Sequence, residues 1–113
     1  MPNTRLLGPY ELTRSNITSY VTKKMPGIFV LGSSKGKTFR VRYIGRSDRD
    51  IGVHLMNLVG AHLSFKFAYH KTAKAAFETE CRLFHSFEAQ LDNRAHPWRT
   101  KLEWRCPYCE TFG

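Results

Sequence analysis

Two apolar segments joined by a glycine- and serine-rich turn constrain the fold of this chain more than any other feature. Residues 28–31 are an uninterrupted apolar run, and residues 38–44 then alternate, with Phe39, Val41 and Tyr43 on one face. Because strand side chains point alternately to opposite faces, this alternation predicts a strand with one buried face. We therefore predict that the two segments pair as an antiparallel β-hairpin.

Three further segments complete the predicted core. Apolar residues recur at helical spacing over residues 51–59, and Gly60 is expected to end that helix. Residues 63–70 alternate as a third strand, and Thr72 is a suitable cap for a long helix over roughly residues 73–90. The predicted fold class is α/β, of the α+β kind: a small three-stranded, mainly antiparallel sheet flanked by helices.

The length of 113 residues fits one structural domain. Within it we distinguish an N-terminal extension at residues 1–26, with a short helix, and a core at residues 27–91. Residues 92–113 form an aperiodic tail that ends in a Cys-x-x-Cys motif and is expected to fold onto the core.

The charge of the chain indicates its class of partner. Eighteen Lys and Arg residues against nine Asp and Glu residues give a formal net charge of +9. So large a surplus on a small surface favours binding to a polyanion, and hence to nucleic acid. The basic residues gather on the hairpin and the third strand, where the predicted contacts are Lys35, Lys37, Arg40, Arg42 and Lys66.

The predicted compartment is cytoplasmic, with no membrane partner. No apolar run approaches the roughly 20 residues that span a bilayer. Three cysteines, an odd number, argue against a secreted disulfide framework.

Glu80 is a carboxylate that the pattern places on a buried helix face rather than in solvent. On the predicted long helix it lies on the same apolar stripe as Phe77 and Phe84, so it points inward. An inward carboxylate needs a partner. A divalent metal ion and a buried salt bridge with a nearby Arg both satisfy that need.

Two triplets in the hairpin connect these features to a known family. The first strand contains Gly27-Ile28-Phe29 and the second contains Tyr43-Ile44-Gly45, thirteen residues apart. Together with the downstream helix that carries Glu80, they resemble the signature of the GIY-YIG nuclease superfamily. The resemblance covers about residues 26–93.

The resemblance implies roles for individual residues. Tyr43 would orient or activate water, and Glu80 would bind Mg²⁺ or Mn²⁺. The helix Arg of the family falls at Val53 or His54, so His54, or an Arg of the preceding loop, would contact phosphate. The catalytic residues implied in this way are Tyr43, Glu80, His54, Arg46, Arg49 and Asn93.

The function that follows is a metal-dependent endonuclease that hydrolyses phosphodiester bonds, in DNA more than in RNA. Two departures from the family leave another interpretation open. Phe29 lacks the hydroxyl of the first signature Tyr, and His54 lacks the permanent bidentate charge of Arg. The alternatives are a nucleic-acid-binding module on the same fold that has lost catalysis, and a small zinc-stabilised protein-interaction domain.

A second metal is predicted from the cysteines. Cys106 and Cys109 form a Cys-x-x-Cys motif, while Cys81 and His85 lie four residues apart on one helix face. Three Cys and one His suit a closed, structural Zn²⁺ site, with His96 as the reserve ligand. A redox pair, or cysteines without metal, are the alternatives.

Aromatic residues interleave with basic ones in the tail. Trp98, Trp104 and Tyr108 could stack on bases or could pack the tail against the core.

Overall fold

The computed structural model describes residues 6–92 and 96–109. Its helices and strands, in chain order, are β1 Leu7–Glu11, α1 Arg14–Tyr20, β2 Gly27–Lys35, β3 Thr38–Ser47, α2 Ile51–Met56, β4 Ser64–Tyr69, α3 Ala73–Phe87 and a short 3₁₀ turn, η1, at Glu88–Gln90.

The strands form one antiparallel sheet in the order β1-β4-β2-β3, which places β3 at one edge. The prediction of an antiparallel sheet flanked by helices is confirmed, but the predicted number of three strands was wrong. The fourth strand, β1, comes from the N-terminal segment that we had assigned as an extension. It pairs with β4 through an irregular register between Leu7 and Tyr10, so it lacks the regular alternation of an ordinary strand.

The hairpin of β2 and β3 is longer than predicted. Strand β2 continues through the expected turn to Lys35, and the turn itself contains only Gly36 and Lys37. In the register of the pair, Phe29 lies opposite Gly45 and Leu31 opposite Tyr43. The two signature triplets are therefore neighbours across the hairpin.

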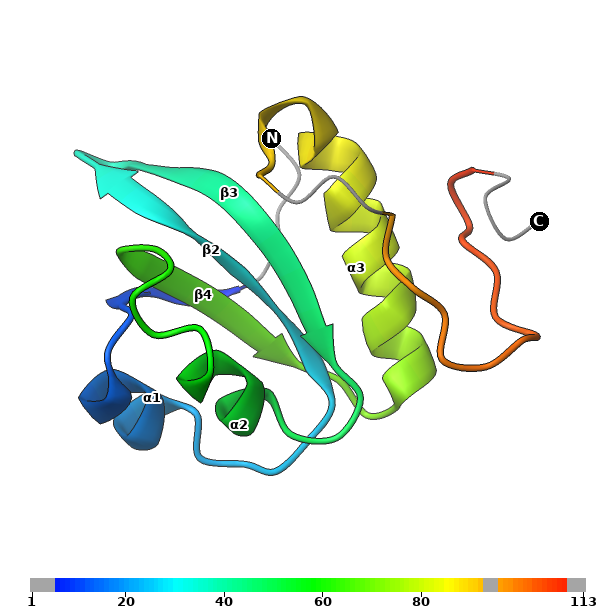
Figure 1. Cartoon of the computed structure of the whole chain (residues 1–113), viewed down its shortest axis with the longest axis horizontal. Helices are drawn as coiled ribbons and strands as arrows, with labels where there is room; N and C mark the ends of the chain where they lie inside the picture. The colour runs from blue at the N-terminus through cyan, green and yellow to red at the C-terminus, as the bar shows by residue number, and fades with distance from the viewer. Residues whose placement is uncertain (1–5, 93–95, 110–113) are drawn as a thin grey trace.

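The sheet lies between two layers of helices (Figure 1). Helices α1 and α2 cover one face, where Ile17 and Leu55 pack against Phe29 and Phe67. Helix α3 covers the other face, and the tail runs along the far side of α3. Because β2 is buried on both faces from Gly27 to Gly32, its sequence is a continuous apolar run.

Two signature glycines are required by close approach. A Cβ atom at Gly45 would lie 2.3 Å from the ring of Phe29. A Cβ atom at Gly27 would lie 2.2 Å from both the carbonyl oxygen of Ala68 and the side chain of Ile51. These glycines let the ring of residue 29 lie against β3 and let α2 approach β2.

Side-chain caps begin helices α2 and α3, and the cap predicted at Thr72 is present. Thr72 accepts a hydrogen bond from the backbone N–H of Ala75, and Asp50 accepts bonds from Gly52 and Val53. Among the described residues, no helix combines the length and the apolar character needed to cross a membrane.

Candidate active site and metal centre

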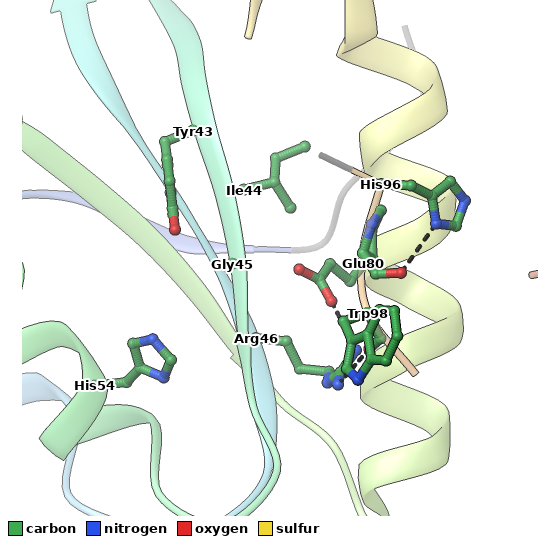
Figure 2. A pocket seen from close by; sticks show the side chains of 9 residues that line it. Tyr43, Ile44, Gly45, Arg46, His54, Glu80, His96 and Trp98 are labelled. Atoms are coloured by element: carbon green, nitrogen blue, oxygen red, sulfur yellow. Dashed lines mark hydrogen bonds and ion pairs between the residues drawn. The ribbon is translucent and has the colours of Figure 1, made fainter. Parts of the chain in front are cut away.

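A pocket of about 300 Å³ lies at the edge strand β3. Residues from β3, α2, α3 and the tail meet there, so the pocket depends on the tertiary fold rather than on one loop (Figure 2). Its lining residues are Tyr43, Ile44, Gly45, Arg46, His54, Glu80, His96, Pro97 and Trp98.

Tyr43 is held by aromatic packing on the face of β3 that meets α2. Its ring is stacked with that of Phe29 at 6.3 Å between centroids, and the ring of Phe29 in turn lies 5.3 Å from that of His54. The phenol and the imidazole reach the pocket from the opposite side of β3 to Glu80 (Figure 2).

Glu80 is paired with Arg46. One nitrogen of the guanidinium donates a hydrogen bond of 2.8 Å to Glu80 Oε1, and both side chains are about nine-tenths buried, at 11% and 9% exposed. The salt bridge that the sequence left open as a partner for Glu80 is therefore present. Among the described residues, Glu80 Oε2 makes no hydrogen bond, and Figure 2 shows it directed away from Arg46 toward Gly45.

The pKa of Glu80 is raised to about 7, chiefly because burial penalises the carboxylate. Arg46 opposes this increase, but its guanidinium also bonds to Asp48 at 2.7 Å, so two carboxylates share one cation. Near neutral pH the carboxyl group of Glu80 can therefore both accept and release a proton.

Arg46 also attaches the tail to the core. It donates hydrogen bonds to the carbonyl oxygen of Trp98 at 2.8 Å and to the hydroxyl of Thr100 at 3.1 Å. Its guanidinium lies over the rings of Phe77 and Trp104, at 5.2 and 5.8 Å from their centroids. With its donors engaged in this way, Arg46 has a structural role, and contact with phosphate would require that network to break.

His54 is not the cation that could replace the family's Arg. Burial and then the charge of Arg46 lower the pKa of His54, with Asp48 opposing weakly. The imidazole is therefore neutral at pH 7 and can accept a proton or a hydrogen bond. The preceding residue, Val53, is 60% exposed and faces two neighbouring pockets.

The other implied catalytic residues differ in placement. Arg49 is exposed, and among the described residues no acidic partner pairs with its guanidinium, so it remains available to a phosphate. Asn93 lies outside the described residues. Phe29 is completely buried, in keeping with its missing hydroxyl.

The predicted nucleic-acid contacts divide into two groups. Lys35, Lys37 and Arg40 are exposed near the hairpin turn. Arg42 forms a salt bridge of 2.6 Å with Asp92, and Lys66 lies over the ring of Phe39 at 5.0 Å. The hairpin turn lies at one end of β3 (Figure 1), whereas the residues of β3 that line the pocket, 43–46, lie toward its other end, so the basic end of the hairpin is separate from the candidate active site.

A potential metal centre joins α3 to the tail. The ligand atoms of four residues lie within 4.8 Å of one another, and these residues are His85, His96, Cys106 and Cys109. The separations are 3.2 Å between the two histidine Nε2 atoms, 3.5 Å from Cys106 Sγ to His85 Nε2 and 3.3 Å from Cys109 Sγ to His96 Nε2. This group could bind a metal such as zinc.

The rings are oriented as metal-binding histidines usually are. The Nδ1 atom of His96 lies 2.9 Å from the carbonyl oxygen of Pro97, and that of His85 lies 3.9 Å from a carboxylate oxygen of Glu88. At His96 this separation is a hydrogen bond, which fixes the tautomer that leaves Nε2 as the ligand atom, whereas at His85 it is an electrostatic contact only.

The predicted ligand set was wrong in one member: the group contains His96 and not Cys81. Cys81 is completely buried in the cluster that Phe77 and Trp104 form with Cys106. Burial raises the pKa of its thiol, which opposes formation of the thiolate that a metal requires. His85, one turn later on α3, lies beside the tail instead.

Sequence reasoning missed the contribution of the tail to the pocket. Pro97 and Trp98 follow His96 directly and line the pocket, where Arg46 donates a hydrogen bond to the carbonyl oxygen of Trp98. A His-Pro pair shortly before a Cys-x-x-Cys motif is the one sequence signal that could have indicated it.

In comparisons with protein-family models, curated proteins and solved structures, no match to the chain was found.

Proposed function

We propose that this protein is a metal-dependent endonuclease of the GIY-YIG kind that hydrolyses phosphodiester bonds in DNA. The observation that carries the proposal is that Tyr43, His54 and Glu80, from three different elements, line one pocket beside the paired signature strands, the first two from the opposite side of β3 to Glu80. The positive charge of the chain supports a polyanionic substrate.

The residues of the pocket have distinct tasks in this proposal. Tyr43, whose ring is fixed by Phe29, would orient the attacking water through its hydroxyl. His54, neutral at pH 7, would accept a proton. The exposed Arg49, which lines the neighbouring cavity that also contains His54, would contact a substrate phosphate.

Glu80 Oε2 would be the protein ligand for Mg²⁺ or Mn²⁺. A single carboxylate is compatible with Mg²⁺, because this ion keeps several waters and commonly binds through one or two carboxylates together with substrate phosphates. The metal would supply positive charge where negative charge develops on the phosphate oxygens.

We also propose that the centre of His85, His96, Cys106 and Cys109 binds a structural Zn²⁺. Tetrahedral zinc, with bonds of about 2.0–2.1 Å to nitrogen and about 2.3 Å to sulfur, sets two nitrogens about 3.3 Å apart and a nitrogen and a sulfur about 3.6 Å apart. Three of the six separations, 3.2, 3.5 and 3.3 Å, agree with these values, and all six lie within 4.8 Å. Four protein ligands leave no position for water, which favours a structural role.

One observation favours a second candidate, a nucleic-acid-binding module without catalysis. Glu80 is bonded to Arg46, and a neighbouring cation weakens the attraction of a carboxylate for a metal ion. The missing hydroxyl at Phe29 and the absence of Arg at residues 53 and 54 point the same way.

Plasmid nicking with and without Mg²⁺ tests the proposal. We expect Tyr43→Phe to reduce the rate about 10²- to 10⁴-fold, because it removes one hydroxyl and keeps the ring. Glu80→Gln should abolish Mg²⁺-dependent nicking, while Glu78→Gln, on the same helix outside the pocket, is the matched control. No nicking by the parent, with nicking by the Phe29→Tyr/His54→Arg double variant, would favour the second candidate.

A further inference from the structure

Trp98 is the most exposed aromatic side chain among the described residues. Its side chain is 72% exposed, although tryptophan is usually well buried. The other tail tryptophan, Trp104, is only 4% exposed and packs against Phe77 with their centroids 5.4 Å apart. Trp104 is therefore a buried packing residue, whereas most of the surface of Trp98 is open to solvent.

The backbone of Trp98 is fixed even though its indole faces solvent. Its carbonyl oxygen accepts a hydrogen bond from Arg46, the preceding Pro97 is buried, and His96 belongs to the metal group. A side chain presented on a fixed backbone loses little conformational freedom when a flat ligand binds to it.

The position of Trp98 relates it to the pocket. It lines the same cavity as Tyr43 and Glu80, and Figure 2 shows the indole beside the Arg46–Glu80 pair. A second cavity, of about 430 Å³, shares His54 with the first and is lined by Arg49, Asp50 and Asn57. Asp50 caps helix α2 through its carboxylate, whereas Arg49 is exposed. An exposed aromatic side chain thus lies at one end of the site and an exposed guanidinium at the other.

We propose that Trp98 is a stacking platform for an unpaired nucleobase, with the adjoining phosphates directed toward Arg49. The inference rests on the proposed function and narrows its substrate class to single-stranded or locally unpaired nucleic acid. A base within a duplex has both faces covered by its neighbours, so only an unstacked base offers a face to the indole.

Equilibrium binding in the absence of Mg²⁺ tests this inference separately from cleavage. A fluorescently labelled thymidine oligonucleotide is titrated with the parent, Trp98→Ala and Trp98→Phe, and a blunt duplex is titrated in parallel. Stacking is worth about 1–3 kcal/mol per base, so Trp98→Ala should weaken single-strand binding about 5- to 150-fold. Trp98→Phe should weaken single-strand binding less than Trp98→Ala does, and neither substitution should change duplex binding.

Leu102→Ala is the matched control, since Leu102 is 83% exposed in the same tail and does not line the pocket. Zinc content and thermal unfolding, measured on each variant, identify any general loss of structure. Unchanged single-strand binding by Trp98→Ala would overturn the inference and leave the indole as a contact for another molecule. Equal losses on single strand and duplex would overturn it too. A chain that binds through Trp98 but does not cut under any condition would instead refute the endonuclease alone.

Discussion

The substitution Arg46→Met tests whether the side chain of Arg46 links the pocket to the tail. The side chain of Arg46 is 9% exposed and bonds to Glu80, Asp48, Trp98 and Thr100. Met keeps much of the volume and removes the charge, which leaves Glu80 buried without its cation. Breaking a buried ion pair from one side costs about 3–5 kcal/mol. For 113 residues the entropy of unfolding gives about 4 °C per kcal/mol, so we expect the midpoint of thermal unfolding to fall by about 12–20 °C.

The assay is thermal and denaturant unfolding of Arg46→Met beside Arg42→Met. Arg42 also forms a salt bridge, at 2.6 Å, but its side chain and that of Asp92 are 42% and 45% exposed, so its loss should cost at most about 1 kcal/mol. The loss of stability in Arg46→Met should be smaller at about pH 5 than at about pH 8, because Glu80 is protonated and uncharged in the folded variant at the lower pH. Equal losses for the two variants at about pH 8 would refute the assignment of Arg46 as the link between core and tail.

Two further predictions concern Glu80 and the metal group. Between its ordinary pKa of 4.5 and its folded pKa of about 7, Glu80 holds a proton in the folded chain that the unfolded chain has lost. Its contribution to stability is therefore lost as the pH rises through this range. Gln does not titrate, so the difference in free energy of unfolding, Glu80→Gln minus parent, should increase by up to about 3 kcal/mol between about pH 5 and pH 8. Denaturant titrations at the two pH values measure this difference. A pH-independent difference would contradict the raised pKa. For the metal group, Cys109→Ser should lose bound zinc on dialysis while Cys81→Ala retains it, as measured by elemental analysis; retention by both variants would show that the four-residue set is wrong.

The parts of the fold that follow local patterns could be predicted from the sequence. Helix α3 has a long apolar stripe and a capping Thr72, so it is specified by its own residues. Strand β3 was predicted from its alternation, but the prediction that Tyr43 shares a face with Phe39 and Val41 was wrong. A register shift in the β2–β3 pair turns Tyr43 to the other face of the sheet. Strand β1 was missed because Gly8 and Pro9 interrupt its middle and most of its residues are exposed.

The candidate site was harder to predict because its decisive contacts are long-range. Arg46 and Glu80 are 34 residues apart, and nothing in their spacing shows that they pair. His96 lies in a tail without periodicity, so only the fold brings it near His85. The pairing of the strands that carry Tyr43 and Gly45 could be predicted from their apolar patterns and the short turn between them, but the register shift at Leu31/Gly32 could not.

The double membership of His96, in the metal group and in the wall of the pocket, affects how any nicking experiment must be designed. EDTA, the usual means of stopping a Mg²⁺-dependent nuclease, also extracts zinc. On the assignment proposed above, it would release the turn that carries Pro97 and Trp98 along with the catalytic ion. Adding back Mg²⁺ alone would then restore the ion to a pocket from which Pro97 and Trp98 have been released, and the assay would show no nicking. Restoration with zinc first and Mg²⁺ second is the order of addition that this arrangement demands.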